Sequence, residues 1–536
     1  MATPTGQAPR VPTKDCEVPA PPILASIVAT IGPSSDTPDT VRRLIEMGVA
    51  VFRFNFSHGD FAAHEKRLKV VRDVSASMGV SVACLGDLQG PKIRVGKVPA
   101  GVGKASASGG GTIAVVPGQD VIFKQGIDLA FIRQGEHGEE PVLPITYQPL
   151  VDEVETGHKV LINDGAIRML AVERNPDAGE LRCRVVVGGN ITSGKGINLP
   201  HSRLSAPAIT ARDWECVAWA LKNELDWLAL SFVRYPTEVK ELRDYVAKMS
   251  DEGKGPWIPV VSKIEMPQAV DNLEAIVDAS DAIMVARGDL GVEMDIAQVP
   301  VVQKRIVEVS AAYGKPCIVA TQMLETMIEN SIPTRAEASD VANAIFDGAD
   351  AVMLSAETAS GKHPVLVVET MARIVAAAEE RLRSLTLEDH PPSKLVAAHR
   401  GIAALAHGAW DIARDLSAKV VVCWSENGGT ARYLSQNRFQ IPIVAYSSDV
   451  RSCRRMAMLR GVTPVCAQPP GSGSLSEWNL AVDQYLLSRG LAQMGDPIVL
   501  LAGRPLGQAK KTNTIAIHRV GEPLGFLEHR DGASAR

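Results

Sequence analysis

The 536-residue chain is poor in three features that would point to a secreted or membrane protein. Its eight cysteines form no CxxC pair and no cluster with ligand-like spacing, which argues against a disulfide framework and a structural zinc site. No apolar run approaches the roughly 18 residues of a membrane-spanning helix. The N-terminus also lacks the basic-then-apolar pattern of a signal peptide. We therefore expect a soluble, cytoplasmic protein with reduced thiols.

The chain also lacks an excess of positive charge. Lysine and arginine number 56 against 61 aspartate and glutamate, which gives a formal net charge of -5. No global field would attract nucleic acid or an anionic membrane, so we expect neither as a partner, and any anionic ligand needs a local basic site. The length predicts about three domains, each large enough to bury its own core.

The pattern along the chain predicts an α/β fold built on a barrel. Residues 1–22 contain six prolines and are predicted to be a disordered tail. Short apolar runs then alternate with amphipathic helical stretches, three runs within 23–90 and five within 200–383. Eight parallel strands with intervening helices would close a (β/α)8 TIM barrel, whose catalytic residues lie at the carboxyl ends of the strands. An open doubly wound sheet is the alternative.

Two other segments interrupt or follow this rhythm. Residues 91–199 are strand-like and rich in turns, which predicts an inserted small β-barrel domain that can act as a lid over the barrel mouth. Residues 395–525 return to an alternating pattern and predict a C-terminal αβ regulatory domain.

Polar residues end four successive strands of the predicted barrel. VVSKIE places Lys263 and Glu265 on one face, and the next strand ends at Asp289. Two converging carboxylates favour a divalent cation such as Mg²⁺, although Asp289 could instead cap a helix. Lys263 would add a fixed positive charge that can stabilise an enolate or a transferring phosphoryl group. Thr321 ends the following strand, and Ser355 and Glu357 follow the last one.

Aromatic residues make up only 4% of the chain, yet VFRFNFS places three phenylalanines at alternate positions. Because side chains alternate across a strand, Phe52, Phe54 and Phe56 should face the helices, and Arg53, Asn55 and Ser57 should face the site.

These motifs, in their order and spacing, resemble pyruvate kinase: FNFSHG, DLQGPKIR, SKIE, ARGDLGVE, ATQMLETM, PTRAEASDVANA and MLSAETASGKHP. The resemblance runs from about Ile23 to Val520. It implies transfer of the phosphoryl group of phosphoenolpyruvate to ADP, giving pyruvate and ATP, with Mg²⁺ or Mn²⁺ as cofactor. It also implies a homotetramer, which is common in the family.

The resemblance assigns roles to individual residues. Glu265 and Asp289 would bind the metal, and Lys263 and Arg53 would hold the phosphoryl group. The substrate carboxylate would be held by Gly288, Asp289 and Thr321, and the proton relay would use Thr321 and Ser355. The nucleotide side would comprise Pro33, Asn55, His58, Arg94 and Lys195, with Asp164 of the inserted domain covering it.

The stretch DLQGPKIRV departs from the potassium-dependent pattern of the family, which has Thr, Lys and Glu where Leu88, Gln89 and Lys92 stand, and Thr where Val95 stands. The family's monovalent-cation positions are matched by Asn55, Ser57 and Asp87, and the ammonium of Lys92 would replace K⁺, which we therefore expect to be dispensable.

WSENGGTAR resembles the family's effector phosphate loop, with the candidate residues Ser425, Asn427, Gly429 and Thr430. Gly429 replaces an arginine found in several members, which favours a sugar monophosphate or AMP as effector. Two other functions stay open: a Mg²⁺-dependent aldolase or related lyase, and a catalytically silent metabolite-binding regulator.

Overall fold

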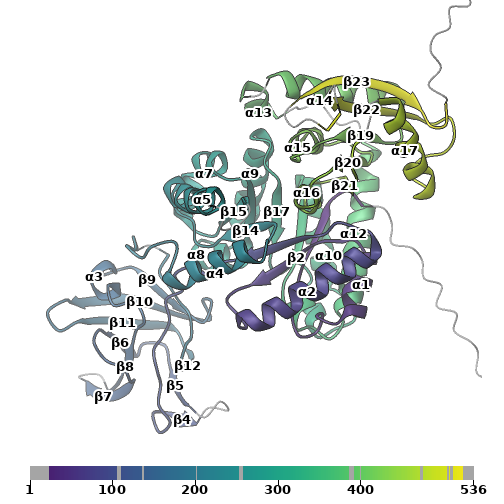
Figure 1. Ribbon diagram of the computed structural model, residues 1–536. Coiled ribbons are helices and arrows are strands. Elements are labelled where there is room, and N and C mark those ends of the chain that lie inside the picture. The colour runs from purple at the N-terminus through teal and green to yellow at the C-terminus, as the bar shows by residue number, and fades with distance from the viewer. Residues whose placement is uncertain are drawn as a thin grey trace, which may run out of the picture.

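The computed structural model describes residues 23–105, 110–135, 138–200, 202–252, 257–385, 392–398, 400–470, 475–503, 506–507 and 511–522. The predicted tail, residues 1–22, lies outside the described residues. Three domains follow one another across the molecule, with the inserted β domain at one end, the barrel in the middle and the C-terminal domain at the other end (Figure 1).

The central domain is a closed barrel of eight parallel strands, so the barrel prediction is confirmed and the open sheet is excluded. In barrel order the strands are β1 (Ser26–Thr30), β18 (Ala351–Leu354), β17 (Cys317–Ala320), β16 (Ala282–Ala286), β15 (Val260–Ile264), β14 (Trp227–Leu230), β3 (Ala83–Asp87) and β2 (Val49–Asn55).

Alternation along each strand divides the apolar residues into two layers. Val28, Val51 and Val261 belong to the cluster inside the barrel, whereas Phe52 and Phe54 belong to the cluster between strands and helices. Helices cover the outside of the barrel: α1 (Pro38–Glu46), α2 (Phe61–Met78), α4 (Ala211–Lys222), α5 (Pro236–Asp251), α6 (Pro267–Asp271), α7 (Leu273–Ala279), α8 (Arg287–Glu293), α9 (Val299–Ala312), η1 (Glu325–Ile328), α10 (Arg335–Asp347), α11 (Ala356–Ala359) and α12 (Pro364–Arg383).

The phenylalanines of β2 face these helices, as predicted. The rings of Phe54 and Phe56 make edge contacts with His64 of α2, and the ring of Phe56 also contacts Trp219 of α4. Aromatic edge contacts of this kind stabilise packing by ~1 kcal/mol beyond the buried area. The few aromatic residues of the chain therefore fix the orientation of β2 and turn its polar side chains inward.

The inserted domain contains two sheets around one apolar cluster. The seven-stranded sheet has the order β13 (Ile197–Asn198), β9 (Lys159–Ile162), β10 (Ile167–Asn175), β11 (Glu180–Val187), β6 (Asp120–Lys124), β8 (Gly138–Pro144) and β7 (Phe131–Gly135). The three-stranded sheet has the order β12 (Gly189–Thr192), β5 (Gly111–Val115) and β4 (Lys104–Ala105), and the short helix α3 (Leu150–Glu153) completes the domain.

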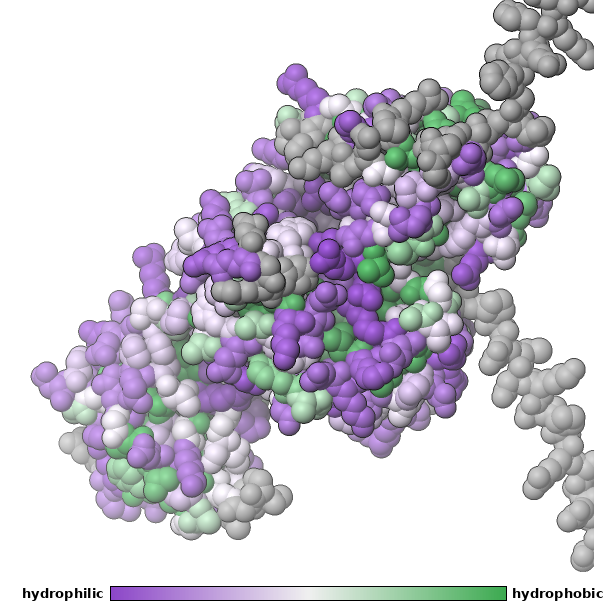
Figure 2. Space-filling view, viewed as in Figure 1, coloured by the Kyte–Doolittle hydropathy of each residue, from purple (hydrophilic) through white to green (hydrophobic). Residues whose placement is uncertain are grey.

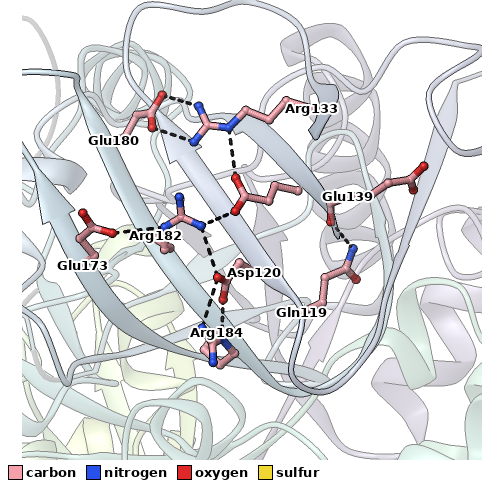
Figure 3. A network of polar contacts seen from close by, with 9 residues as sticks. Gln119, Asp120, Arg133, Glu139, Glu173, Glu180, Arg182 and Arg184 are labelled. Atoms are coloured by element: carbon pink, nitrogen blue, oxygen red, sulfur yellow. Dashed lines mark hydrogen bonds and ion pairs between the residues drawn. The ribbon is translucent and has the colours of Figure 1, made fainter. Parts of the chain in front are cut away.

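A network of ion pairs crosses the strands of the seven-stranded sheet (Figure 3). Arg182 of β11 pairs with Asp120 of β6, at 3.3 Å, and with Glu140 of β8. Glu140 and Glu180 both accept from Arg133 of β7. Burial alone would raise the pKa of Asp120 and Glu140, but the arginines outweigh it and hold both pKa values below their usual range.

The C-terminal domain has one sheet in the order β21 (Val462–Cys466), β20 (Ile443–Ser447), β19 (Val421–Trp424), β22 (Pro497–Gly503) and β23 (Thr512–Arg519), of which only β23 runs antiparallel to its neighbour. Its helices are α13 (Ser393–Ala398), α14 (Arg400–Asp415), α15 (Gly429–Gln436), α16 (Val450–Met456) and α17 (Leu475–Ser488).

The C-terminal domain closes the floor of the barrel. Ala457 and Met458, which follow α16, are buried in the apolar cluster inside the barrel. Ser26 at the start of β1 donates to the Ala457 carbonyl at 3.2 Å, and the Gly461 amide donates to the Leu24 carbonyl at 2.6 Å. The inserted domain follows the carboxyl end of β3 and lies at the opposite end of the molecule from the C-terminal domain (Figure 1), and it forms a lobe at that end in the space-filling view (Figure 2). Among the described helices, none combines the length and apolar composition of a membrane span.

We predict that Arg182→Gln destabilises the inserted domain, because Asp120 and Glu140 each lose one of the cations that compensate their burial. Hydrogen exchange at β6 and β11 should become faster while exchange in the barrel is unchanged, and Arg174→Gln, at the exposed end of β10, is the control.

The same carboxylates should make this domain labile to acid. Because their folded pKa values are depressed, their contribution is complete above the unfolded pKa of about 4 and is lost as the pH falls through the folded values. Hydrogen exchange in the inserted domain that is no faster in acid than at neutral pH would contradict this role of the carboxylates.

Candidate active site at the mouth of the barrel

Four adjacent strands bring a cluster of charged side chains to the mouth of the barrel. Asn55 of β2 lies beside Asp87 of β3, and Ala229 of β14 lies on the other side of Asp87. Leu230 in turn lies beside Ser262 of β15. This register places Arg53, Asp87, Ser231, Lys263 and Glu265 at the same end of the barrel, where (β/α)8 proteins carry their active sites.

Lys263 is the centre of this cluster. Its ammonium lies 2.8 Å from Glu265 Oε1 and 3.3 Å from Asp87 Oδ1, and it donates to Ser231 Oγ at 2.8 Å. Burial alone would lower the pKa of Lys263, but Asp87 and Glu265 outweigh it and raise the pKa, so the ammonium is retained. The side chain is only 9% exposed, which makes it a fixed positive charge in a site of low dielectric.

Arg53 is held against the same carboxylate. Its Nε and Nη2 atoms lie 2.7 and 2.6 Å from Asp87 Oδ2, and its Nη1 donates to Thr30 Oγ1 at 3.1 Å. Burial would raise the pKa of Asp87, but Lys263 and Arg53 together lower it below its usual value. Asp87 therefore stays ionised and orients both cations.

Glu265 and Asp289 form the acidic side of the cluster. Burial raises the pKa of Glu265 to about 7; Lys263 opposes the rise and the charge of Asp289 adds to it. Glu265 Oε2 accepts from the Phe232 amide at 2.7 Å, while Oε1 is buried and has no hydrogen-bond partner among the described residues besides its ion pair with Lys263. Among the described residues, no group of three or more His, Cys, Asp or Glu could hold a metal, so any metal here would need ligands besides these two carboxylates.

Thr321 and Gly288 meet just beyond the carboxyl ends of the neighbouring strands β17 and β16. The Gly288 amide donates to Thr321 Oγ1 at 2.7 Å, and Thr321 has a φ of 70°. This conformation costs ~1–3 kcal/mol for a residue other than glycine and needs support from its surroundings. Arg287 supplies that support, because it donates to the Thr321 carbonyl at 2.7 Å and pairs with Asp340 at 2.7 Å.

Ser355 and Glu357 lie in the loop after β18. The carboxylate of Glu357 is fully buried and accepts from the Ser355 amide at 2.6 Å and the Leu324 amide at 3.3 Å. Glu357 therefore ties together two loops of the rim, while the partly buried Ser355 side chain lies at the rim itself.

The predicted nucleotide residues are spread over the barrel rim and the roots of the inserted domain. Pro33 and His58 are exposed on the rim. Arg94 donates to the Gly194 carbonyl at 2.8 Å, and Lys195 donates to Asn163 Oδ1 at 2.8 Å, so both are held within the inserted domain.

The predicted monovalent-cation positions do not all lie on strands. Asn55 ends β2, and its Oδ1 accepts from the amide of Ser57 at 3.1 Å. Ser57 itself stands in the exposed turn after β2, beyond the end of the polar row on the strand. Asp164 is exposed in its turn of the inserted domain, with a φ of 54°.

A pocket of about 70 Å³ separates the roots of the inserted domain from the barrel and includes Lys92, Asn198, Asp289 and Glu293 in its lining. Asn198 Nδ2 donates to Glu293 Oε1 at 2.8 Å and so joins the inserted domain to α8. The Lys92 side chain lies against Gly196, where an added Cβ would come within 3.1 Å of its Cε. The Lys92 ammonium makes no ion pair or hydrogen bond with another described residue.

The effector-loop candidates lie between β19 and α15. Ser425 Oγ accepts from the Ala431 amide at 3.1 Å, and Thr430 Oγ1 lies 2.6 Å from Thr512 Oγ1. Gly428, with a φ of 78°, immediately precedes α15, and Gly429 is the first residue of that helix. Asn427 lies in the turn between these elements.

Three site residues were missed by reasoning from the sequence: Ser231, Thr30 and Arg287. Ser231 and Thr30 could have been found, because each is a polar residue at the carboxyl end of a barrel strand. Arg287 stands in the ARGD motif, but its contacts with the Thr321 loop and with α10 depend on the barrel order.

The fold and this cluster together define a (β/α)8 barrel with a buried, cationic and acidic site suited to an anionic substrate. Two family models match the chain: "Pyruvate kinase, barrel domain" over residues 24–368 and "Pyruvate kinase, alpha/beta domain" over residues 403–518. The chain belongs to the pyruvate kinase family, whose reaction is phosphoryl transfer from phosphoenolpyruvate to ADP.

Curated relatives agree over nearly the whole chain. A pyruvate kinase of Mycobacterium tuberculosis is 40% identical over 498 residues, covering 92% of this chain and 98% of the relative. The pyruvate kinase of Corynebacterium glutamicum is 39% identical, and the match covers 92% of this chain and 97% of the relative. That of Thermotoga maritima is 37% identical, and the match covers 92% of this chain and 99% of the relative.

We predict that Ser231→Ala lowers kcat by roughly three- to tenfold, because Lys263 loses one hydrogen bond that fixes its ammonium, a loss of ~1 kcal/mol. The control is Ser262→Ala, on the same strand as Lys263, which removes a buried hydroxyl that bonds Ser280 instead. Steady-state kinetics and thermal unfolding measure the two effects. A kcat equal to that of the control would show that Ser231 does not position Lys263.

Proposed function

We propose that the charged cluster at the barrel mouth carries out the phosphoryl transfer of the family in this chain. The observation that supports the proposal is the buried Lys263, which is held between Asp87 and Glu265 with Arg53 beside it. Phosphoryl transfer requires mainly positioning and charge neutralisation, and fixed cations in a buried site supply both.

Lys263 and Arg53 would bind the phosphoryl group of phosphoenolpyruvate. As the phosphorus–oxygen bond breaks, negative charge develops on the enolate oxygen, and the ammonium of Lys263 would stabilise it. The substrate carboxylate would lie at the amides of Gly288 and Asp289 and at the hydroxyl of Thr321, which the Gly288 amide already contacts.

Glu265 and Asp289 fit a divalent cation by their chemistry. Burial raises the pKa of Glu265, and the neighbouring charge of Asp289 raises it further, so a cation held by both carboxylates would favour their ionised forms. Mg²⁺ or Mn²⁺ accepts one or two carboxylates together with substrate oxygens, and when bound it would supply positive charge to the transferring group.

Thr321 and Ser355 would deliver the proton that converts the enolate to pyruvate. Both stand at the rim, directly after the strands β17 and β18, and both carry hydroxyls that can take part in a relay with water. ADP would bind on the other side, at Pro33, Asn55, His58, Arg94 and Lys195, with Asp164 of the inserted domain covering it. The bond of Asn198 with Glu293 would guide the inserted domain over the site.

A coupled assay tests this function against the two alternatives. Pyruvate formation from phosphoenolpyruvate should require both ADP and a divalent cation. Turnover without ADP would favour the lyase, and no turnover under any condition would favour the regulator. The family resemblance further suggests a cytoplasmic homotetramer, and light scattering of the purified protein would measure that assembly.

We predict that Lys263→Met lowers kcat by roughly 10²- to 10³-fold and changes KM much less, because its charge matters most in the transition state. The control is Lys304→Met on α9, which removes an exposed lysine whose partner is Asp347. An unchanged kcat in Lys263→Met would remove Lys263 from the mechanism.

The enzyme should work without K⁺. The ammonium of Lys92 has no partner among the described residues, so it is free to supply the positive charge that K⁺ supplies elsewhere in the family. At a separation of about 4 Å and an effective dielectric near 20, a second cation would be repelled by roughly 4 kcal/mol.

We predict full activity with Mg²⁺ in a tetramethylammonium buffer and little stimulation when K⁺ is added. Lys92→Glu should lose activity, and Lys97→Glu, an exposed lysine of the same segment, is the control. Strong activation of the wild type by K⁺ would refute the replacement.

The loop around Ser425, Asn427, Gly429 and Thr430 would bind a sugar monophosphate or AMP through its amides and hydroxyls. We predict that one of these compounds lowers the half-saturating phosphoenolpyruvate concentration in the wild type. Asn427→Asp should abolish the response by adding a negative charge, and Asn437→Asp at the far end of α15 should retain it. A flat response of the wild type to every compound would argue against an effector site.

A further inference from the structure

Two thiols of the C-terminal domain lie beside the same residue, Ser447. Cys453, on α16, is fully buried and its Sγ donates to the Ser447 carbonyl at 3.7 Å. Cys466, the last residue of β21, is the parallel-strand partner of Ser447 in the sheet. Neighbouring strands are about 4.8 Å apart, so this register brings the Cys466 thiol next to the Cys453 thiol.

The two thiols differ in access to solvent. Cys466 is exposed because β21 is an edge strand, whereas the six other described cysteines are buried. Burial raises the pKa of Cys453, and the neighbouring Cys466 raises it further, in agreement with the proximity that their shared neighbour Ser447 gives. An accessible thiol beside a buried one is the arrangement of a reactive and a resolving cysteine.

We propose that Cys453 and Cys466 form a reversible disulfide when the protein meets a peroxide. The Cys466 thiol first loses its proton, and the thiolate attacks one peroxide oxygen to form a sulfenic acid. The other oxygen leaves as hydroxide, which takes up the proton lost by the thiol and becomes water. Cys453 then attacks this sulfur, and the sulfenic oxygen leaves as a second water together with the Cys453 proton. Two thiols have lost two hydrogen atoms and the peroxide has been reduced to two waters.

The disulfide would restrain the element that connects the C-terminal domain with the barrel. Cys453 lies within α16. The two residues that directly follow this helix, Ala457 and Met458, are packed inside the floor of the barrel. A bond from Cys453 to Cys466 would fix α16 against β21. Oxidation at the surface of the C-terminal domain would therefore act on the contact between the two domains.

The test uses the full chain with Cys16→Ser, which removes the one cysteine outside the described residues. After hydrogen peroxide and alkylation, peptide mapping without reductant should find Cys453 linked to Cys466 within one chain, and dithiothreitol should restore both thiols. Cys466→Ser should keep Cys453 free. Cys423→Ala, which removes a buried thiol of the same domain, should still form the bond.

Two results would overturn the proposal in the otherwise intact protein: sulfinic acid at Cys466 with Cys453 unmodified, or a disulfide that joins Cys466 of two chains. Hydrogen exchange of α16 supplies a second measurement. The amides of α16 should exchange more slowly in the oxidised protein than in the reduced protein. Equal exchange in the two forms would show that the bond does not restrain this helix.

Discussion

The buried ammonium of Lys263 is the charge around which the mouth of the barrel is organised. A lysine taken out of water loses its proton unless carboxylates compensate it. Asp87 does so from β3, and Glu265 does so from the end of β15, the strand that carries Lys263 itself. The removal of either carboxylate would leave part of the buried positive charge uncompensated, which is costly in a buried site. The barrel supplies this geometry because its strands are held in register by their hydrogen bonds.

The same constraint explains the layering of β2 and β3. Phe52 and Phe54 occupy the outer face of β2, so that Arg53 must face the interior, where Asp87 is its partner. An arginine buried to 9% exposure without that carboxylate would be unstable, and Asp87 in turn depends on both cations for its ionised state. Core packing and site electrostatics are therefore fixed by the same alternation along one strand.

Much of this could be predicted from the sequence. The count of eight apolar runs predicted the barrel. The positions of Lys263, Glu265 and Asp289 at the ends of such runs predicted a rim that carries both acidic and cationic side chains. Contacts that depend on barrel order could not be read in this way, such as those of Arg287 with Asp340 and the Thr321 loop. Glu357 was expected at the rim. Its carboxylate accepts hydrogen bonds from two backbone amides there, and the residue type alone could not reveal these partners.

The two ends of the barrel are connected to different domains, and the strands span the distance between them. Ser26, which begins β1, bonds the C-terminal domain, and Thr30, which ends the same strand, bonds Arg53 of the charged cluster. A strand of five residues has little freedom to deform between these contacts, because both of its neighbours are hydrogen-bonded to it. The same strand therefore joins the C-terminal domain at the floor to the charged cluster at the mouth, and Gly461 adds a second bond at the floor through the Leu24 carbonyl.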